Sequence, residues 1–310
     1  MNQKTWKSAI FYYAAAFLLI LACLIFLQNR TKPALENSEV NSSDLRIVSM
    51  APDLTEILFA LDLGDNIVAV SSDSNYPEQA LTKKKAGTFW NPDLEAVLSV
   101  QPTLVFALQD RQQGDLAKQL KRIGCQTVSL KMETLAQMYR SIQTIGSRTN
   151  REDRADRLVR QITDGLEKYK DLSAGATAAK VLWVVQRQPL RAASENTFFN
   201  ELLKIAGAQN AVRTTLFQYP PLDEEQLIAA APDIIIETAD KPEDLRRLQA
   251  TAQTFYARFK TVPAVGNNRI YAIDGDLLCR LGPRLPLGMK ALVECIHPST
   301  SQGNPSDADF

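Results

Sequence analysis

The residue types that most often carry out acid–base, nucleophilic or metal chemistry are sparse in this sequence. The single histidine, His297, lies near the carboxyl terminus, so neither a histidine-based acid–base centre nor a multi-histidine metal site can be assembled. The sequence contains no Gly-x-Ser-x-Gly elbow, Walker loop or Gly-x-Gly-x-x-Gly motif. Carboxylates alone could still support an enzyme, although no pair of them stands out. Binding through aromatic and charged side chains is the chemistry that these residues favour.

One stretch of sequence occurs twice. Residues 93–106 (DLEAVLSVQPTLVF) match residues 223–236 (DEEQLIAAAPDIII) at a constant offset of 130, which pairs Glu95 with Glu225. Each copy contains an acidic helix start, a proline and an apolar run typical of a strand. The chain therefore uses one supersecondary unit in each of two similar halves.

Aromatic residues precede both copies of the repeat. Phe89 and Trp90 stand before the first copy, and Phe217 and Tyr219 stand before the second. Two pseudo-symmetric lobes would present these loops to each other across a cleft, outside the carboxyl ends of their strands. This arrangement favours a binding site over a catalytic one.

The order of helices and strands predicts an α/β fold with two Rossmann-like lobes. In the first half we expect strands at residues 46–50, 67–70, 104–106 and 127–130, and helices at 53–61, 92–98 and 115–123. In the second half we expect strands at 181–185, 234–237 and 270–273, and helices at 198–206, 224–230, 242–259 and 283–296. This alternation indicates parallel sheets with helices on both faces. Gly64, Gly124 and Gly207 are each expected to end a helix.

A long amphipathic helix is expected at residues 150–172, between the two halves. Its apolar residues recur every three or four positions, and Thr149 with Glu152 has the form of a capping box. At 1.5 Å per residue it would span roughly 34 Å. Such a helix is long enough to connect two lobes as a backbone.

The amino terminus predicts attachment to a membrane. Residues 9–27 form an uninterrupted apolar and aromatic run, long enough for the roughly 30 Å hydrocarbon core of a bilayer. Because no small-x-small cleavage site follows, we expect a retained transmembrane helix, while Ile20-Leu21-Ala22-Cys23 leaves a lipoprotein as the alternative. The predicted domains are an anchor (1–30), a linker (31–44), an N-terminal lobe (45–131), connecting helices (132–173), a C-terminal lobe (178–298) and a tail (299–310).

Charge excludes one class of partner. The 35 basic and 35 acidic residues balance, and no basic stripe is present, so the sequence predicts no nucleic-acid binding. With 45% hydrophobic residues, both lobes can bury a core. We expect a monomer.

Five segments resemble the Fe/B12 periplasmic-binding family of ABC-importer substrate-binding proteins. They are residues 46–58 (RIVSMAPDLTEIL), 72–77 (SDSNYP), 87–95 (GTFWNPDLE), 101–105 (QPTLV) and 282–284 (GPR), and the similarity extends over roughly residues 45–298. The family binds vitamin B12, ferric siderophores or haem between two α/β lobes joined by a backbone helix. The Tyr-Pro loop and the Gly-Pro-Arg segment are most similar to the cobalamin-binding members.

This resemblance implies a set of site residues. Those implied to contact a flat, nearly neutral corrinoid are Tyr76, Phe89, Trp90, Phe198, Phe217, Tyr219, Arg280 and Arg284. Glu95 and Glu225 would meet arginine pockets on the two subunits of a permease that works with an ATPase. A ferric siderophore or haem stays open as the ligand, because an anionic chelate could be held by Arg187, Arg191, Arg280 and Arg284.

The resemblance therefore implies a substrate-binding protein without catalytic activity or cofactor. It would be held on the extracytoplasmic side of the cytoplasmic membrane by its N-terminal segment and would deliver its ligand to the ABC permease. A membrane-tethered α/β enzyme that uses cleft carboxylates is the alternative from another class.

Overall fold

The computed structural model describes residues 45–109, 111–170, 178–239 and 241–298 of the chain. These residues belong to one compact unit, Ser42–Phe310. The apolar run at residues 9–27, the linker 31–44 and the tail 299–310 lie outside the described residues. Within the described ranges, no helix combines the length and apolar character needed to cross a bilayer.

The first sheet is parallel throughout. Its strands are β1 (Ile47–Ser49), β2 (Ile67–Val70), β3 (Lys84–Lys85), β4 (Leu104–Leu108) and β5 (Gln126–Leu130), in the order β3-β2-β1-β4-β5. The helices of this lobe are α2 (Pro52–Ala60), α3 (Leu94–Ser99) and α4 (Arg111–Arg122). The chain order therefore reverses direction between β1 and β4, as in doubly wound folds.

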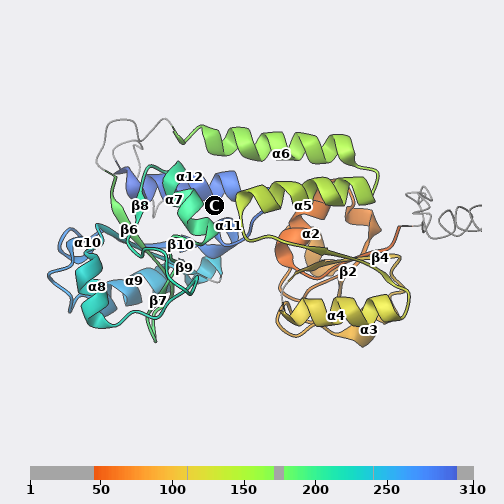
Figure 1. The fold of residues 1–310 in the computed structure, drawn as a ribbon, viewed down its shortest axis with the longest axis horizontal. Helices are drawn as coiled ribbons and strands as arrows, with labels where there is room; N and C mark the ends of the chain where they lie inside the picture. Colours follow the sequence, from red (N-terminus) through yellow and green to blue (C-terminus); the bar gives the residue numbers. More distant parts are fainter. Residues whose placement is uncertain (1–44, 110, 171–177, 240, 299–310) are drawn as a thin grey trace, which may run out of the picture. The chain divides into compact units, whose positions relative to one another are not determined.

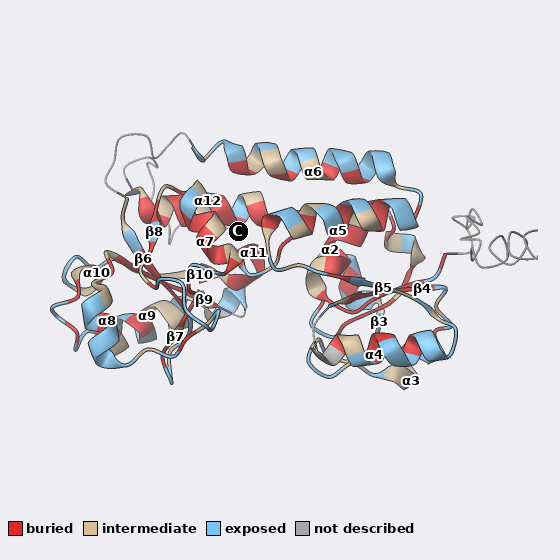
Figure 2. Cartoon of the chain, in the orientation of Figure 1, coloured by how far each residue is buried: buried red, intermediate tan, exposed pale blue. Residues whose placement is uncertain are grey.

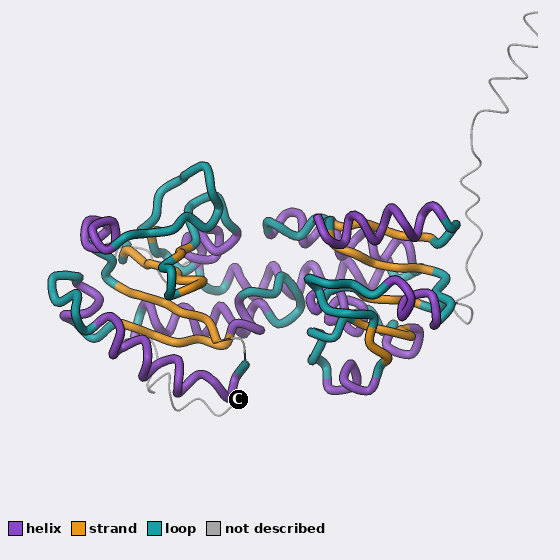
Figure 3. Tube along the Cα trace, turned by 90° about the horizontal axis from the view of Figure 1, so that it is seen from below, coloured by secondary structure: helices purple, strands orange, loops and turns teal. Residues whose placement is uncertain are grey.

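The second sheet has the same general plan with one antiparallel strand. Its strands are β6 (Lys180–Gln186), β7 (Arg191–Ala192), β8 (Gln209–Asn210), β9 (Ile234–Ala239) and β10 (Ile270–Asp274). β10, β9, β6 and β8 pair in parallel, whereas β7 is antiparallel to β6. The helices are α7 (Phe198–Ile205), α8 (Glu224–Ala230), α9 (Leu245–Tyr256), α10 (Pro263–Gly266), α11 (Gly275–Leu278) and α12 (Leu285–Ile296). Figure 3 shows the strands of the two sheets as two separate groups.

The backbone confirms the internal repeat. α3 and α8 begin at equivalent positions, each with an aspartate N-cap, Asp93 or Asp223, that accepts a hydrogen bond from the third helical N–H. Four residues after each N-cap, Val97 and Leu227 are both buried. Gln101 and Ala231, again 130 residues apart, both adopt the left-handed conformation, with φ of 46° and 43°. The two copies therefore share a main-chain path as well as a sequence pattern.

Three apolar cores lie on the faces of the two sheets. One continuous core contains Ile47 and Phe106 of the first sheet together with Trp183 and Ile236 of the second. On the opposite face of each sheet lies a separate core, one beneath α3 and α4 and the other beneath α8 and α9. Alternate residues of a strand point to opposite faces, so neighbours such as Ile47 and Val48 enter different cores.

The shared core is closed by α5 (Leu135–Arg148), α6 (Glu152–Glu167) and α12. Figure 1 shows α6 lying along both α5, beside the first sheet, and α12, beside the second. Its buried residues are Ala155, Leu158, Ile162 and Leu166, and its outer face is exposed (Figure 2). The three- and four-residue spacing in the sequence thus predicts the correct face.

Glycine allows α6 to approach both of its neighbours closely. A Cβ at Gly146 of α5 would stand 2.6 Å from Ala155 Cβ, and a Cβ at Gly165 of α6 would stand 2.8 Å from Pro286 of α12. Both distances are shorter than van der Waals contact. The connection between the lobes therefore requires small residues where the helices meet.

Several sequence-based expectations about these helices are wrong in detail. α6 has 16 residues and ends at Glu167, five residues before the expected end, although Tyr169 beyond it still packs against the shared core. The capping box at Thr149 is absent: Thr149 ends α5, and its hydroxyl donates to the Ile145 carbonyl at 2.7 Å. Gly64 does not end α2, because Asp62 takes the left-handed conformation there, with φ of 64°. Gly124 and Gly207 do have positive φ, as expected.

The substitution Gly165→Ala is expected to lower the free energy of unfolding by about 1–3 kcal/mol, because its Cβ would overlap the rigid Pro286 ring. The same change at Gly114 in α4 is the matched control, since nothing lies within 4 Å of a Cβ there. Gly114→Ala should raise the free energy of unfolding by up to about 1 kcal/mol. Urea unfolding followed by circular dichroism measures both, and equal effects would contradict this packing.

Candidate ligand-binding site

The two lobes meet where segments that follow parallel strands come together. The loop after β2 contains Asn75 and Tyr76, and the segment after β10 contains Asp276, Arg280 and Arg284. Side-chain hydrogen bonds join these segments across more than 200 residues of sequence. In open α/β sheets, ligands bind outside the carboxyl ends of the strands. We call this group of side chains, together with Glu56 and Asp53 of α2, the interlobe junction.

Glu56 is the centre of the interlobe junction. Its carboxylate accepts two hydrogen bonds from Arg284, at 2.9 Å from Nε and 2.6 Å from a terminal nitrogen, and a third from Arg280 at 3.3 Å. The Glu56 side chain is 2% exposed, against 14% for Arg284 and 16% for Arg280. Such a buried charge is stable only with its partners in place.

Asp276 and Asn75 complete the network. Asp276 pairs with Arg280 at 2.6 Å, and Asn75 donates to Asp276 at 2.7 Å. Arg280 in turn donates to the Asn75 amide oxygen at 2.6 Å. Each arginine is therefore paired with at least one carboxylate of the protein itself.

Two further carboxyl groups lie near these charges. Burial raises the pKa of Asp53 to about 6; the Leu54 N–H and Arg280 oppose this increase, and Glu56 reinforces it. Burial also raises the pKa of Asp274, and the Asp276 carboxylate acts in the same direction. The Arg284 guanidinium lies 4.0 Å from the centre of the Tyr76 ring, which is 45% exposed. The junction thus presents an aromatic ring beside neutralised charges.

The first-lobe aromatic loop has an inner and an outer residue. Phe89 packs against the shared core, whereas Trp90 is 71% exposed, and their rings meet edge-to-face with centroids 4.8 Å apart. The Phe89 N–H donates to Asp73 at 2.6 Å, which ties this loop to the loop that contains Tyr76. Trp90 is thus exposed, as its place in a polar loop suggests.

The second-lobe aromatics show a similar division. Tyr219 and Phe198 are partly buried against the shared core, whereas Phe217 is 63% exposed. Phe199, next to Phe198, stacks on Trp183 at 4.4 Å, and both are core residues. At the offset of the repeat, Phe89 corresponds to Tyr219. Each lobe thus has one half-buried aromatic residue and, in the same loop, one exposed aromatic residue.

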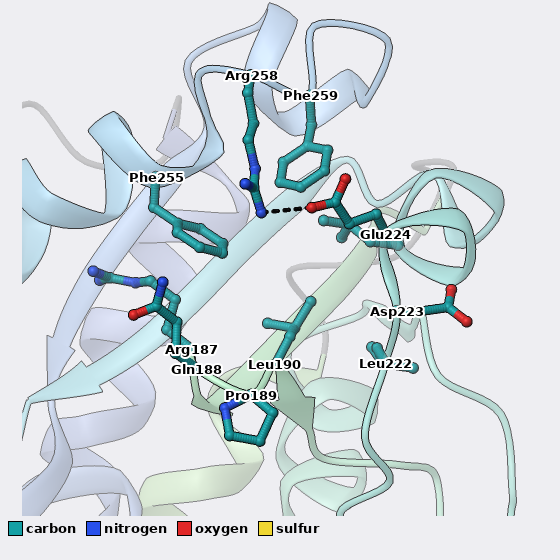
Figure 4. A pocket seen from close by; sticks show the side chains of 11 residues that line it. Arg187, Gln188, Pro189, Leu190, Leu222, Asp223, Glu224, Phe255, Arg258 and Phe259 are labelled. Carbon is teal, nitrogen blue, oxygen red and sulfur yellow. Dashed lines mark ion pairs between the residues drawn. The ribbon is translucent and has the colours of Figure 1, made fainter.

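Glu95 and Glu225 occupy the same position in α3 and α8, and both are exposed. Figure 1 shows these two helices on the side of the sheets away from α6. Within the described part of the chain, neither glutamate forms an ion pair. Glu224, which precedes Glu225, does form an ion pair, with Arg258 at 2.8 Å. Both side chains line a hollow of about 380 Å³, which Figure 4 shows.

The four arginines considered for an anionic ligand do not share one partner. Arg187 forms a bidentate pair with the buried Glu237 and lines the hollow of Figure 4. Arg191 donates to the Tyr219 carbonyl at 3.0 Å. Arg280 and Arg284 share Glu56, as described above. Arg187 and Arg191 thus bond to different groups outside the interlobe junction, whereas Arg280 and Arg284 belong to it.

Sequence reasoning missed Glu56, Asn75 and Asp276 as members of the site. Glu56 and Asn75 lie in segments that carry the family resemblance, but nothing local marks them as partners of Arg284 and Arg280. Asp276 and Arg280 are four residues apart, which is the spacing of an ion pair on one helical turn. That spacing is the one signal that could have identified a member of the network.

The chain belongs to the periplasmic binding protein family, whose model matches residues 47–277. Within it, the chain falls in the Fe/B12 periplasmic-binding group, as the sequence resemblance indicated.

Three similar proteins illustrate the group. One is an uncharacterized ABC transporter substrate-binding lipoprotein, YvrC, of Bacillus subtilis, 31% identical over 82% of this chain and 81% of its own length. A vitamin B12-binding protein of Pectobacterium carotovorum is 25% identical over 80% of this chain and 86% of its own. The crystal structure of a possible iron-binding protein from Staphylococcus epidermidis superposes with a TM-score of 0.72 at 29% identity, over 81% of this chain and 98% of that one.

The raised pKa of Asp53 predicts a pH-dependent effect of Asp53→Asn. The folded protein binds this proton more tightly than the unfolded chain, so Asp53 costs stability above pH 6 and none below about pH 4. Asp53→Asn should therefore raise the free energy of unfolding by about 1–3 kcal/mol more at pH 8 than at pH 4. Urea unfolding at both pH values measures this difference. The exposed Asp65→Asn is the control, and an equal pH dependence of both variants would contradict the assignment.

Proposed function

We propose that this chain is the substrate-binding protein of an ABC importer and that it binds a corrinoid between its two lobes. Family membership supports the transport class, and it weighs against the α/β enzyme considered from the sequence. The observation that carries the choice of ligand is the pair of equivalent aromatic loops, Phe89 with Trp90 and Tyr219 with Phe217. Aromatic rings provide a large contact area for a flat ligand at little conformational cost.

The polar residues near these loops also suit a nearly neutral ligand. Arg280 and Arg284 are neutralised by Glu56 and Asp276, whereas Arg191, which donates to the Tyr219 carbonyl, is the one of the four candidate arginines without an ion pair among the described residues. An anionic siderophore or the propionates of haem would need unpaired cations at the site. Ferric siderophores and haem remain the alternatives, since a relative of similar fold is described as possibly iron-binding.

The proposal extends to delivery. Glu95 and Glu225 lie on equivalent helices on one side of the molecule, where they could meet two symmetric basic pockets of a permease that works with an ATPase. Exposed charges of this kind mainly guide association and fix its register. The N-terminal segment would hold the protein at the extracytoplasmic face of the membrane, either as a retained helix or as a lipid anchor at Cys23. The name of the lipoprotein YvrC favours the lipid anchor.

Binding of cyanocobalamin by the compact unit, measured by isothermal titration calorimetry, tests the ligand. Trp90→Ala and Phe217→Ala should each weaken binding by about 5- to 20-fold, because each removes one exposed stacking surface. Ile123→Ala, at an exposed apolar residue outside the aromatic loops, should leave binding unchanged. Absence of binding to the unmodified protein would exclude a corrinoid and favour the iron chelates.

Charge reversal at Glu95 and Glu225 tests delivery. Each of Glu95→Arg and Glu225→Arg should reduce cobalamin uptake by cells at least about tenfold while ligand affinity stays the same, because a like charge would face the permease. Glu243→Arg, at an exposed acidic residue of the second lobe, is the control. Uptake that is unaffected by either reversal would exclude these glutamates from docking.

A further inference from the structure

The interlobe junction carries no surplus of positive charge, although it contains two arginines. Among the described residues, the terminal nitrogens of Arg284 bond to Glu56 and the Asp276 carbonyl, and those of Arg280 bond to Glu56, Asn75 and Asp276. Two carboxylates thus balance two guanidinium groups. Asp53 and Asp274 add negative charge whenever they are ionised.

These charges lie where a ligand would come close to them. The Arg284 guanidinium stacks on Tyr76, a ring that is 45% exposed and that belongs to the segments resembling the family's binding site. Because both arginines are largely buried, water screens their charge poorly. Loss of one carboxylate would therefore leave a positive charge that a ligand at Tyr76 experiences.

From these contacts we propose that Glu56 is a specificity-determining residue that neutralises Arg280 and Arg284 and thereby excludes polyanionic ligands from the site. The proposal deepens the proposed function and rests on ligand binding between the lobes. It predicts that the natural ligand class is neutral or cationic. It also explains why two arginines can lie in a site for a nearly neutral molecule.

Glu56 is suited to this role because it is bonded to both arginines at once. The Asp276 carboxylate pairs with Arg280, whereas Arg284 contacts only the main-chain carbonyl of Asp276, to which it donates at 3.5 Å. Glu56→Gln therefore removes the charge that compensates both guanidinium groups, and the amide oxygen can still accept a hydrogen bond. Asp276→Asn removes compensation from Arg280 alone and should have the same effect to a smaller extent.

The test compares two ferric chelates that differ in charge, a neutral ferric trihydroxamate and a trianionic ferric tricatecholate, with the full chain in lipid nanodiscs. Glu56→Gln should bind the trianion at least about tenfold more tightly than the unmodified protein, with neutral-chelate binding altered less than about threefold. This gain should shrink as salt is added. The double variant Glu56→Gln with Arg284→Gln should lose the gain, and Glu224→Gln, which breaks an exposed pair elsewhere, should show none.

The proposal would be overturned if the ratio of the affinities for the two chelates were the same in Glu56→Gln as in the unmodified protein. If circular dichroism shows that Glu56→Gln does not fold, Asp276→Asn replaces it in the test. A smaller gain in affinity for the trianionic chelate would then support the proposal, and no gain would overturn it. A parallel titration with cyanocobalamin separates the two hypotheses. If the unmodified protein does not bind cyanocobalamin, the corrinoid is rejected as the ligand. The role of Glu56 is judged separately, from the ratio of the affinities for the two chelates.

Discussion

The continuous apolar core beneath α6 is the constraint on which the two-lobe arrangement depends. It joins one face of the first sheet to one face of the second, while the opposite face of each sheet has its own separate core. A rotation of one lobe against the other must disturb packing between α6 and either α5 or α12, where Gly146 and Gly165 leave no free space. Because apolar interiors are close-packed, this favours small changes of lobe opening over large ones.

The interlobe junction needs this rigidity. Glu56 is almost fully buried, and a buried carboxylate is tolerated only while its hydrogen-bond partners stay in position. Those partners, Arg280 and Arg284, come from the other lobe. The shared core fixes the distance across which these ion pairs form, and the ion pairs in turn favour one relative orientation of the lobes. Apolar packing thus provides most of the cohesion, and the charges add orientation.

The sequence predicts the elements of this fold better than it predicts its site. Periodicity locates β2 and α8 at their observed bounds and identifies the buried face of α6, because these features depend on local pattern. It misses the short strands β3, β7 and β8, which have two residues each. Strands this short are defined by their pairing with neighbouring strands and have no periodic pattern of their own. It also misses the partners of Arg284, since Glu56 lies 228 residues away and no local rule relates them. The repeat is the exception, because the constant offset of 130 relates each position in one copy to the equivalent position in the other.

The repeat also places one acidic residue of each lobe at an equivalent exposed position. Val97 and Leu227 anchor α3 and α8 on the separate cores, so Glu95 and Glu225, two residues earlier, lie on the surface away from α6. The aspartate N-caps fix the first turn of both helices and so place Glu95 and Glu225 at equivalent backbone positions. In the second copy, Arg258 pairs with Glu224, whereas Glu225 has no ion pair within the described ranges. Each copy of the repeat therefore begins its helix with one exposed acid that forms no ion pair among the described residues, and this equivalence follows from the shared main-chain path of the two copies.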